Sequence, residues 1–298
     1  MKKLLTGLLF APIVALAGET STPAELGSAP AGSAEAQGVN ALVNSGYIVA
    51  ITHNIGGELA YGGGTGAIAL VNDLIGSKQP DVVALQEVCQ TQATAFWNTN
   101  APRGYWAAFY PTKYKAACGG TGGANHGNLI AARSEYPLAG PYNLALPGNS
   151  GHGMICVDFT KEGRTFRACS THLIAGSGPD DNTRLNQANT IKSWSLGWMN
   201  EGYRVMVGGD FNSAPSFPVI QTLNHLGNGD PFIDADQAAN RETKRQYSAA
   251  CNQPWNSKLD YMFFAYNWTG KKYVEATLRG DGSCSDHRAL IGTARVTN

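Results

Sequence analysis

The stretch Val205–Met206–Val207–Gly208–Gly209–Asp210–Phe211–Asn212 carries the strongest indication of the fold in this chain. Its valine-rich start is typical of a buried β-strand, and the two glycines predict a sharp backbone turn where that strand ends. Asp210 and Asn212 would point to the same side if the backbone stays extended. An acid and an amide at a strand end suit a hard cation and a phosphate oxygen, although both residue types also favour ordinary turns.

Composition allows a large folded core. The chain has 298 residues, of which 43% are hydrophobic and 15% charged, enough for one large domain or two small ones. Residues 1–17 read as a secretory signal peptide, because Lys2 and Lys3 precede an apolar run that ends in Ala15–Leu16–Ala17. That run is too short to span a bilayer. We therefore expect a secreted, extracellular protein.

The segment after the signal is rich in Ala, Ser, Gly and Pro, so residues 18–46 are predicted to form a disordered linker. The folded domain is expected over 47–298. Signal cleavage would remove two of the 22 basic residues and none of the 22 acidic ones, which leaves a formal charge of −2. This charge disfavours a generally basic nucleic-acid coat and allows a local basic patch.

Six cysteines in an exported chain indicate three disulfides rather than a metal cluster. A turn at Glu162–Gly163 would form a hairpin that places Cys156 directly opposite Cys169, at a non-hydrogen-bonded pair suited to a disulfide. Asp158 and Arg167 would face each other in the same register. Sequence proximity pairs the remaining cysteines as Cys89–Cys118 and Cys251–Cys284.

The rest of the chain alternates between strand-like and helix-like segments, which predicts an α/β protein with a mixed sheet or a pair of sheets. The expected strands are 47–55, 81–88, 105–110, 128–132, 154–160, 164–171, 205–210, 259–265 and 289–296, with helices at 66–75, 91–97 and from Asp180 onward. Carboxylate, amide and histidine side chains stand directly before or after these strands. They are Asn54, Glu87, His172, Asp210, Asn212, Asp260, Asp286 and His287.

Taken together, these positions resemble the motifs of the endonuclease/exonuclease/phosphatase superfamily, which has the deoxyribonuclease-I-like fold. The motifs occur in the family's order and cover nearly all of 47–296. They are Thr52–His53–Asn54, Leu85–Gln86–Glu87, Thr171–His172–Leu173, Gly209–Asp210–Phe211–Asn212, Leu259–Asp260–Tyr261 and Ser285–Asp286–His287. The resemblance implies a four-layer α/β/β/α sandwich and phosphoester hydrolysis that depends on Mg²⁺ or Mn²⁺, with structural Ca²⁺ as an additional candidate.

The resemblance also implies roles for single residues. Glu87, Asn54 and Asp286 would hold the metal. Asp210 and Asn212 would orient the attacking water and the phosphate. His287, held by Asp260, would be the general base or a phosphate contact, and His172 would contact the phosphate or assist the leaving oxygen.

Elementary chemistry agrees with these roles. A phosphodiester is anionic and repels hydroxide, so its hydrolysis needs a cation, and a hard cation prefers oxygen ligands. A histidine supplies a base near neutral pH, and a carboxylate on its far nitrogen fixes the tautomer. A buried structural carboxylate is the competing interpretation for Asp260. Motif context is absent at His126, His152 and His225, which we expect to be structural. His53 stands at a usually aromatic position, where it either repacks the floor of the site or adds a charge.

Substrate choice leaves three alternatives. A nuclease ranks first, with Arg184, Asn128 and the basic cluster Arg241, Lys244 and Arg245 as candidate substrate contacts. A lipid-headgroup phosphodiesterase or phosphatase is second, and would use apolar loops such as 215–218 or 253–255. A non-catalytic binding module is a distant third, because every motif residue is present. No obligate protein partner is inferred.

Overall fold

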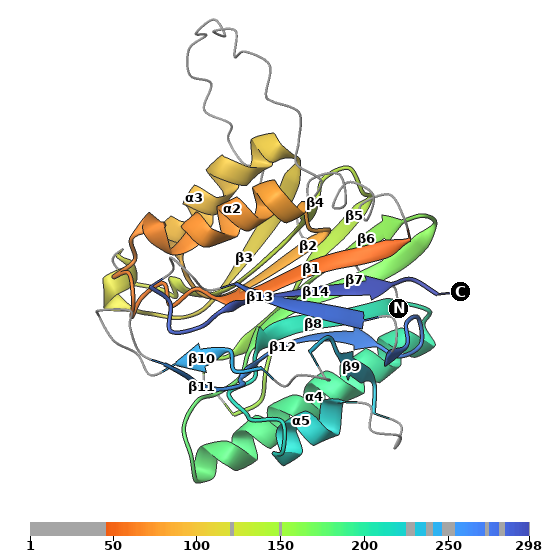
Figure 1. Ribbon diagram of the computed structural model, residues 1–298. Coiled ribbons are helices and arrows are strands. Elements are labelled where there is room, and N and C mark those ends of the chain that lie inside the picture. The colour runs from red at the N-terminus through yellow and green to blue at the C-terminus, as the bar shows by residue number, and fades with distance from the viewer. Residues whose placement is uncertain are drawn as a thin grey trace, which may run out of the picture.

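The computed structural model describes residues 46–119, 122–148, 151–224, 230–236, 241–245, 254–271, 274–279 and 284–297. Two six-stranded sheets pack face to face, and helices cover the outer face of each sheet (Figure 1). This arrangement confirms the predicted four-layer sandwich. The predicted signal peptide and nearly all of the predicted linker, residues 1–45, lie outside the described residues.

The first sheet has the strand order β13–β14–β1–β2–β4–β3. Only β1 and β2 are parallel neighbours, and the other pairs are antiparallel. Its strands are β1 (Tyr47–Asn54), β2 (Val82–Cys89), β3 (Tyr105–Lys113), β4 (His126–Arg133), β13 (Val274–Arg279) and β14 (Ala289–Arg295).

The second sheet has the order β5–β6–β7–β8–β12–β9, in which only β7 and β8 are parallel. Its strands are β5 (Leu138–Ala145), β6 (Gly153–Lys161), β7 (Arg164–His172), β8 (Arg204–Asp210), β9 (Phe232–Asp234) and β12 (Asp260–Ala265). A small ladder of β10 (Lys244–Arg245) and β11 (Trp255–Ser257) lies apart from both sheets.

The helices flank the sheets as Figure 1 shows. On the first sheet, α2 (Ala69–Lys78) and α3 (Gln90–Asn100) bury apolar residues against β1 and β2. On the second sheet, α4 (Pro179–Asn200) and α5 (Pro218–Leu223) do the same. None of the helices in the described part of the chain is long and apolar enough to cross a membrane. Short 3₁₀ turns occur at Thr65–Ile68, Ala101–Arg103 and Ala116–Cys118.

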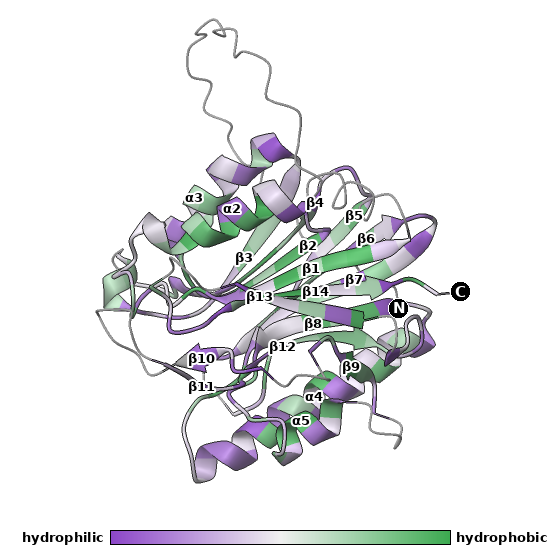
Figure 2. Cartoon of the chain, viewed as in Figure 1, coloured by the Kyte–Doolittle hydropathy of each residue, from purple (hydrophilic) through white to green (hydrophobic). Residues whose placement is uncertain are grey.

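Burial on both faces explains the continuous apolar runs of the central strands. In β1, Val49 and Ile51 face the helices, whereas Ile48 and Ala50 face the other sheet. The hydropathy colouring in Figure 2 shows the same pattern, with green concentrated on the central strands and purple on the outer sides of the helices.

The two glycines of the opening stretch do not turn the chain, so our prediction for them was wrong. Both lie within β8, and the left-handed turn comes later, at Asn212, where φ is 48°. Gly208 instead allows close packing, because a Cβ there would lie 2.9 Å from the Thr52 Cβ and 3.1 Å from the Ala84 Cβ of the first sheet. Close packing of the two sheets therefore requires a glycine at position 208.

The β6–β7 hairpin has the predicted register. Glu162 and Gly163 form the turn with positive φ, and Cys156 pairs with Cys169. The Cys156–Cys169 disulfide is present, as is Cys89–Cys118. Cys284 is also disulfide-bonded, while Cys251, its predicted partner, lies outside the described residues. The expected Asp158–Arg167 pair forms two hydrogen bonds, of 2.6 and 2.7 Å.

Candidate active site

The first sheet contributes Asn54, the last residue of β1, and Glu87 near the end of β2. A register shift in β2 and a φ of 55° at Glu87 mark a bulge that redirects this side chain. Asn54 Nδ2 donates to Glu87 Oε1 at 3.1 Å and to Asp210 Oδ2 of the second sheet at 3.0 Å. Burial raises the pKa of Glu87, but the Asn54 hydrogen bond and nearby cationic groups outweigh it, so the pKa is lowered. Glu87 is therefore ionised at neutral pH.

The second sheet contributes Asp210 at the end of β8 and His172 at the end of β7. Asp210 Oδ1 accepts the Asn212 backbone N–H at 2.8 Å, which fixes the turn after the strand. Asn212 Nδ2 lies 3.0 Å from His172 Nε2, and that nitrogen lies 3.6 Å from Asp210 Oδ2. Burial holds the pKa of His172 well below its usual range, so His172 is neutral. Asp210, Asn212 and His172 thus lie together at one edge of the second sheet.

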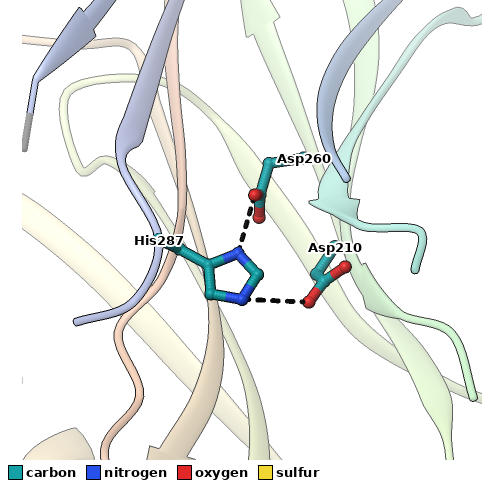
Figure 3. A group of neighbouring side chains, drawn as sticks. All are labelled: Asp210, Asp260 and His287. Atoms are coloured by element: carbon teal, nitrogen blue, oxygen red, sulfur yellow. Dashed lines mark hydrogen bonds and ion pairs between the residues drawn. The ribbon is translucent and has the colours of Figure 1, made fainter. Parts of the chain in front are cut away.

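Asp260 and His287 form a buried pair, and a second carboxylate approaches the other ring nitrogen (Figure 3). His287 Nδ1 lies 2.7 Å from Asp260 Oδ2, and Nε2 lies 3.6 Å from Asp210 Oδ2 and 3.8 Å from Asp286 Oδ1. Nε2 has no hydrogen-bond partner. Burial lowers the pKa of His287, but Asp260 and Asp210 outweigh it and raise the pKa to about 9. The ring therefore carries a proton on each nitrogen at neutral pH.

A lysine sits among the carboxylates of the site. Lys244 Nζ lies 3.4 Å from Asp286 Oδ2, and the Lys244 backbone forms an isolated β-bridge with His287. Burial lowers the pKa of Lys244. The negative charges of Asp210, Asp286 and the other nearby carboxylates outweigh burial, so the pKa of Lys244 is raised overall. Lys244 is thus a fixed positive charge within an acidic site.

The donor set suits a hard cation. Ligand atoms of Asp210, Asp260 and His287 lie within 4.8 Å of one another, the only such group among the described residues. His287 Nδ1 is already bonded to Asp260, so this triad is better interpreted as a proton-holding pair beside a carboxylate. The oxygens of Glu87, Asp286 and Asn54 at the same edge match the preference of Mg²⁺ or Mn²⁺.

His53 is fully buried beneath the site. Its Nε2 lies 3.3 Å from the backbone oxygen of His287, and burial lowers its pKa to about 4. Of our two interpretations, the structure favours a neutral ring that packs the floor of the site over an added charge.

Two residues predicted to contact the substrate form hydrogen bonds within the protein instead. Arg184 is 5% exposed and donates to Ile174, Gly176 and Asp181, so it fastens the loop before α4 and does not face the site. Asn128 is nearer the site but donates to the Gly153 carbonyl at 2.8 Å.

The predicted basic cluster is also divided. Arg241 is held by Asp236 at 2.8 Å and by the Ala276 carbonyl at 2.8 Å, whereas Lys244 turns toward the site. The side chain of Arg245 lies outside the described residues. The two described side chains of this cluster, Arg241 and Lys244, therefore have different partners within the protein.

Sequence reasoning missed Thr243 and the position of two histidines next to His172. Thr243 Oγ1 accepts the backbone N–H groups of Leu259 and Asp260, each at 3.0 Å, and so holds the start of β12. His126 and His152, expected to be structural, border a hollow beside His172. Neither feature has a local sequence signal, because each depends on strands brought together by the fold; His225 lies outside the described residues.

The candidate lipid-binding loops differ from each other. Phe217 in the 215–218 loop is 53% exposed, while Trp255 packs under Arg288, whose guanidinium carbon lies 4.2 Å from the ring centroid. Among the described residues of these two loops, Phe217 is the large apolar side chain most exposed to solvent.

Comparison with known proteins agrees with this geometry. The human Nocturnin catalytic domain with bound sulfate is 20% identical, with a TM-score of 0.65 over 84% of this chain and 94% of that chain. Truncated Caenorhabditis elegans TDP2 is 18% identical, with a TM-score of 0.64 over 84% and 98%. An endonuclease/exonuclease/phosphatase from Bacteroides vulgatus is 16% identical, with a TM-score of 0.64 over 84% and 99%.

At these identities the likeness shows the fold alone. No curated protein matches the sequence. The sequence profile of the Endonuclease/Exonuclease/phosphatase family, however, matches residues 51–287, which include every strand-end residue described above. The chain belongs to the endonuclease/exonuclease/phosphatase family, whose members are hydrolases of phosphoester bonds.

Proposed function

We propose that this protein is a secreted, divalent-metal-dependent phosphodiesterase that cleaves nucleic acid. The observation that carries the proposal is the meeting of Asn54, Glu87, Asp210 and the Asp260–His287 pair at one edge of the two sheets. Export is supported by the predicted signal peptide and by the two disulfides, since disulfides persist in oxidising compartments.

Glu87, Asp286 and Asn54 would hold Mg²⁺ or Mn²⁺, which neutralises charge that develops on the phosphate. His287, with a proton on each ring nitrogen, donates from Nε2 to a phosphate oxygen. Asp210 lies beside that nitrogen and accepts a proton from the attacking water, while Asn54 and Asn212 orient the carboxylate. As the new P–O bond forms, the P–O bond to the leaving oxygen breaks, and solvent supplies the proton for that oxygen. His172, with the Asn212 amide against it, contacts the phosphate from the other side.

The first of two observations suits any anionic phosphodiester, and the second favours nucleic acid as the substrate. Lys244 places a positive charge at the site despite the low net charge of the chain. Among proteins of this fold, Danio rerio TDP2 has been solved in complex with a single-stranded DNA product, at 16% identity and a TM-score of 0.61 over 83% of this chain and 98% of that chain.

The test is a hydrolysis assay on plasmid DNA, RNA, sphingomyelin vesicles and bis(4-nitrophenyl) phosphate. We expect cleavage of nucleic acid and of the small diester with Mg²⁺ or Mn²⁺, and none in EDTA. Undiminished cleavage in EDTA would refute metal dependence. If only vesicles were cleaved, and Phe217→Ala removed that activity while sparing the small diester, the substrate would be a lipid headgroup.

A further inference from the structure

The backbone of Glu87 adopts a conformation that residues with a side chain disfavour. Its φ is 55°, in the left-handed region, where the pairing of β2 with β4 shifts between Leu85 and Val88. A residue keeps such a conformation only if its surroundings hold it there. Asn54 holds the Glu87 carboxylate, at 3.1 Å. The backbone that carries this carboxylate needs a support of its own.

Gln92 provides that support from the first turn of α3. It is fully buried, and both polar atoms of its amide form hydrogen bonds with the backbone. Oε1 accepts the N–H of Cys89, the last residue of β2, at 2.8 Å. Nε2 donates to the carbonyls of Gly57 and Gly64, at 2.9 and 3.0 Å. One side chain thus joins the start of the helix to both ends of the 57–64 loop, which follows β1.

Gly57 carries the contact from Gln92 to Glu87. Its N–H donates to the Glu87 carbonyl at 3.1 Å, while its own carbonyl accepts from Gln92. The three residues are also packed closely, because a Cβ at Gly57 would overlap Gln92 Oε1 and lie 2.5 Å from the Glu87 carbonyl oxygen. A shift of Gln92 would therefore move the loop, and with it the N–H group that holds the Glu87 backbone.

We propose that Gln92 is a positioning residue for the candidate metal site, acting through Gly57 on the backbone of Glu87. All three of its hydrogen bonds go to backbone atoms, so it acts on a metal ligand and not on the substrate. Replacing groups that orient the ligands of a metal typically weakens metal binding by about 10–100-fold. The inference rests on the proposed function, because it takes Glu87 as a ligand of Mg²⁺ or Mn²⁺.

Asn100, at the other end of α3, offers a matched control. It is also a fully buried amide, and its Nδ2 donates to Asn72 Oδ1 at 2.8 Å and to the Phe96 carbonyl at 3.0 Å. These bonds hold the last turn of α3 and link it to α2, at the end of the helix away from Glu87. Replacement of either amide removes buried hydrogen bonds from the same helix. Both variants should therefore lose stability, and a role limited to stability should leave both with the same metal affinity.

The first test is calorimetric titration of the purified protein with Mn²⁺, at a temperature where every variant is folded. We expect Gln92→Ala to bind Mn²⁺ at least about tenfold more weakly than wild type, and Asn100→Ala to bind it as wild type does. Gln92→Glu is a second variant, because its carboxylate can still accept the Cys89 N–H but cannot donate to the two loop carbonyls. It should show the same weakening, which assigns the effect to the loop and not to the helix start.

Amide hydrogen exchange in EDTA tests the same contacts without metal. The Gly57 N–H should exchange at least about tenfold faster in Gln92→Ala than in Asn100→Ala, because its partner Glu87 is less firmly held. If wild type binds no Mn²⁺, the proposed function fails, and Gly57 exchange still decides whether Gln92 holds the Glu87 backbone. The inference is overturned if both alanine variants bind Mn²⁺ equally, if Gln92→Glu binds it as wild type does, or if Gly57 exchanges at the same rate in both alanine variants.

Discussion

His287 Nδ1 lies 2.7 Å from Asp260 Oδ2, in a pair that is almost wholly buried. The carboxylate fixes the ring so that Nε2 points toward Asp210. We expect His287→Ala to lower kcat/KM by roughly 10²–10⁴-fold. Asp260→Asn should cause a smaller loss, because the ring remains but its charge and orientation are less well held. Steady-state kinetics on the small diester measure both, and a fully active Asp260→Asn enzyme would show that the pair does not matter for turnover.

Glu87 is expected to hold the metal. Glu87→Gln keeps the shape and the Asn54 contact but removes the charge, so activity should fall by orders of magnitude while the unfolding free energy changes little. Calorimetric titration with Mn²⁺ should show that this variant binds the metal more weakly than the wild-type protein does. Wild-type affinity for Mn²⁺ in Glu87→Gln would contradict the assignment.

Thr243 should act through the start of β12. Thr243→Val removes the acceptor for two backbone N–H groups, at Leu259 and Asp260, and should destabilise the protein by about 1–3 kcal/mol. We also expect kcat to fall with little change in KM, because Asp260 loses its position. Thr243→Ser retains the oxygen and should behave as wild type in urea unfolding and kinetics; a fall in kcat for Thr243→Ser as large as that for Thr243→Val would exclude this explanation.

Because His53 is buried, the free energy of unfolding should depend on pH. Its folded pKa, about 4, lies below the unfolded value near 6.5, so its contribution is fully present above pH 6.5 and is lost as the pH falls toward 4. Between pH 7 and 5 this loss should be about 2 kcal/mol. In urea unfolding, His53→Phe should lose that much less stability over this range than wild type. Equal losses in the two proteins would indicate that His53 is charged in the folded state.

Gly208 should be intolerant of any side chain. The Cβ of Gly208→Ala would lie 2.8 Å from Met262 Cε and 2.9 Å from Thr52 Cβ, and such overpacking costs about 1–3 kcal/mol. Gly197→Ala is the matched control, because its Cβ meets nothing within 4 Å in α4 and the helix gains propensity. Thermal unfolding should separate the two, and equal stability of both variants would refute the packing argument.

Periodicity and register predicted the parts of the fold that depend on local sequence. The β6–β7 hairpin could be predicted to the residue pair, because a two-residue turn fixes register and Cys156 and Cys169 obey it. Strands β5, β9, β10, β11 and β13 were not predicted. β9, β10 and β11 have only two or three residues each, too few for a periodic pattern. β5 and β13 lie at sheet edges with much of their surface exposed, and β5 contains Pro141, so neither shows an apolar strand pattern.

The site was partly predictable for the same reason. Strand-end residues such as Asp210 and His172 could be found because each follows an apolar run. The role of Thr243 and the position of His126 beside His172 could not be found, because both depend on neighbours on other strands. The role of Gly208 was misread, because a glycine needed for contact between sheets has the same local sequence as one needed for a turn.

The Asn54 amide, which binds Glu87 on its own sheet and Asp210 on the other, makes catalysis a reporter of tertiary structure. A collapsed state that kept both sheets but let them separate would retain its far-ultraviolet circular dichroism and lose the site. Enzymatic activity should therefore disappear together with the near-ultraviolet signal during unfolding, whatever secondary structure persists. A simple activity assay could thus follow the docking of the two sheets during refolding.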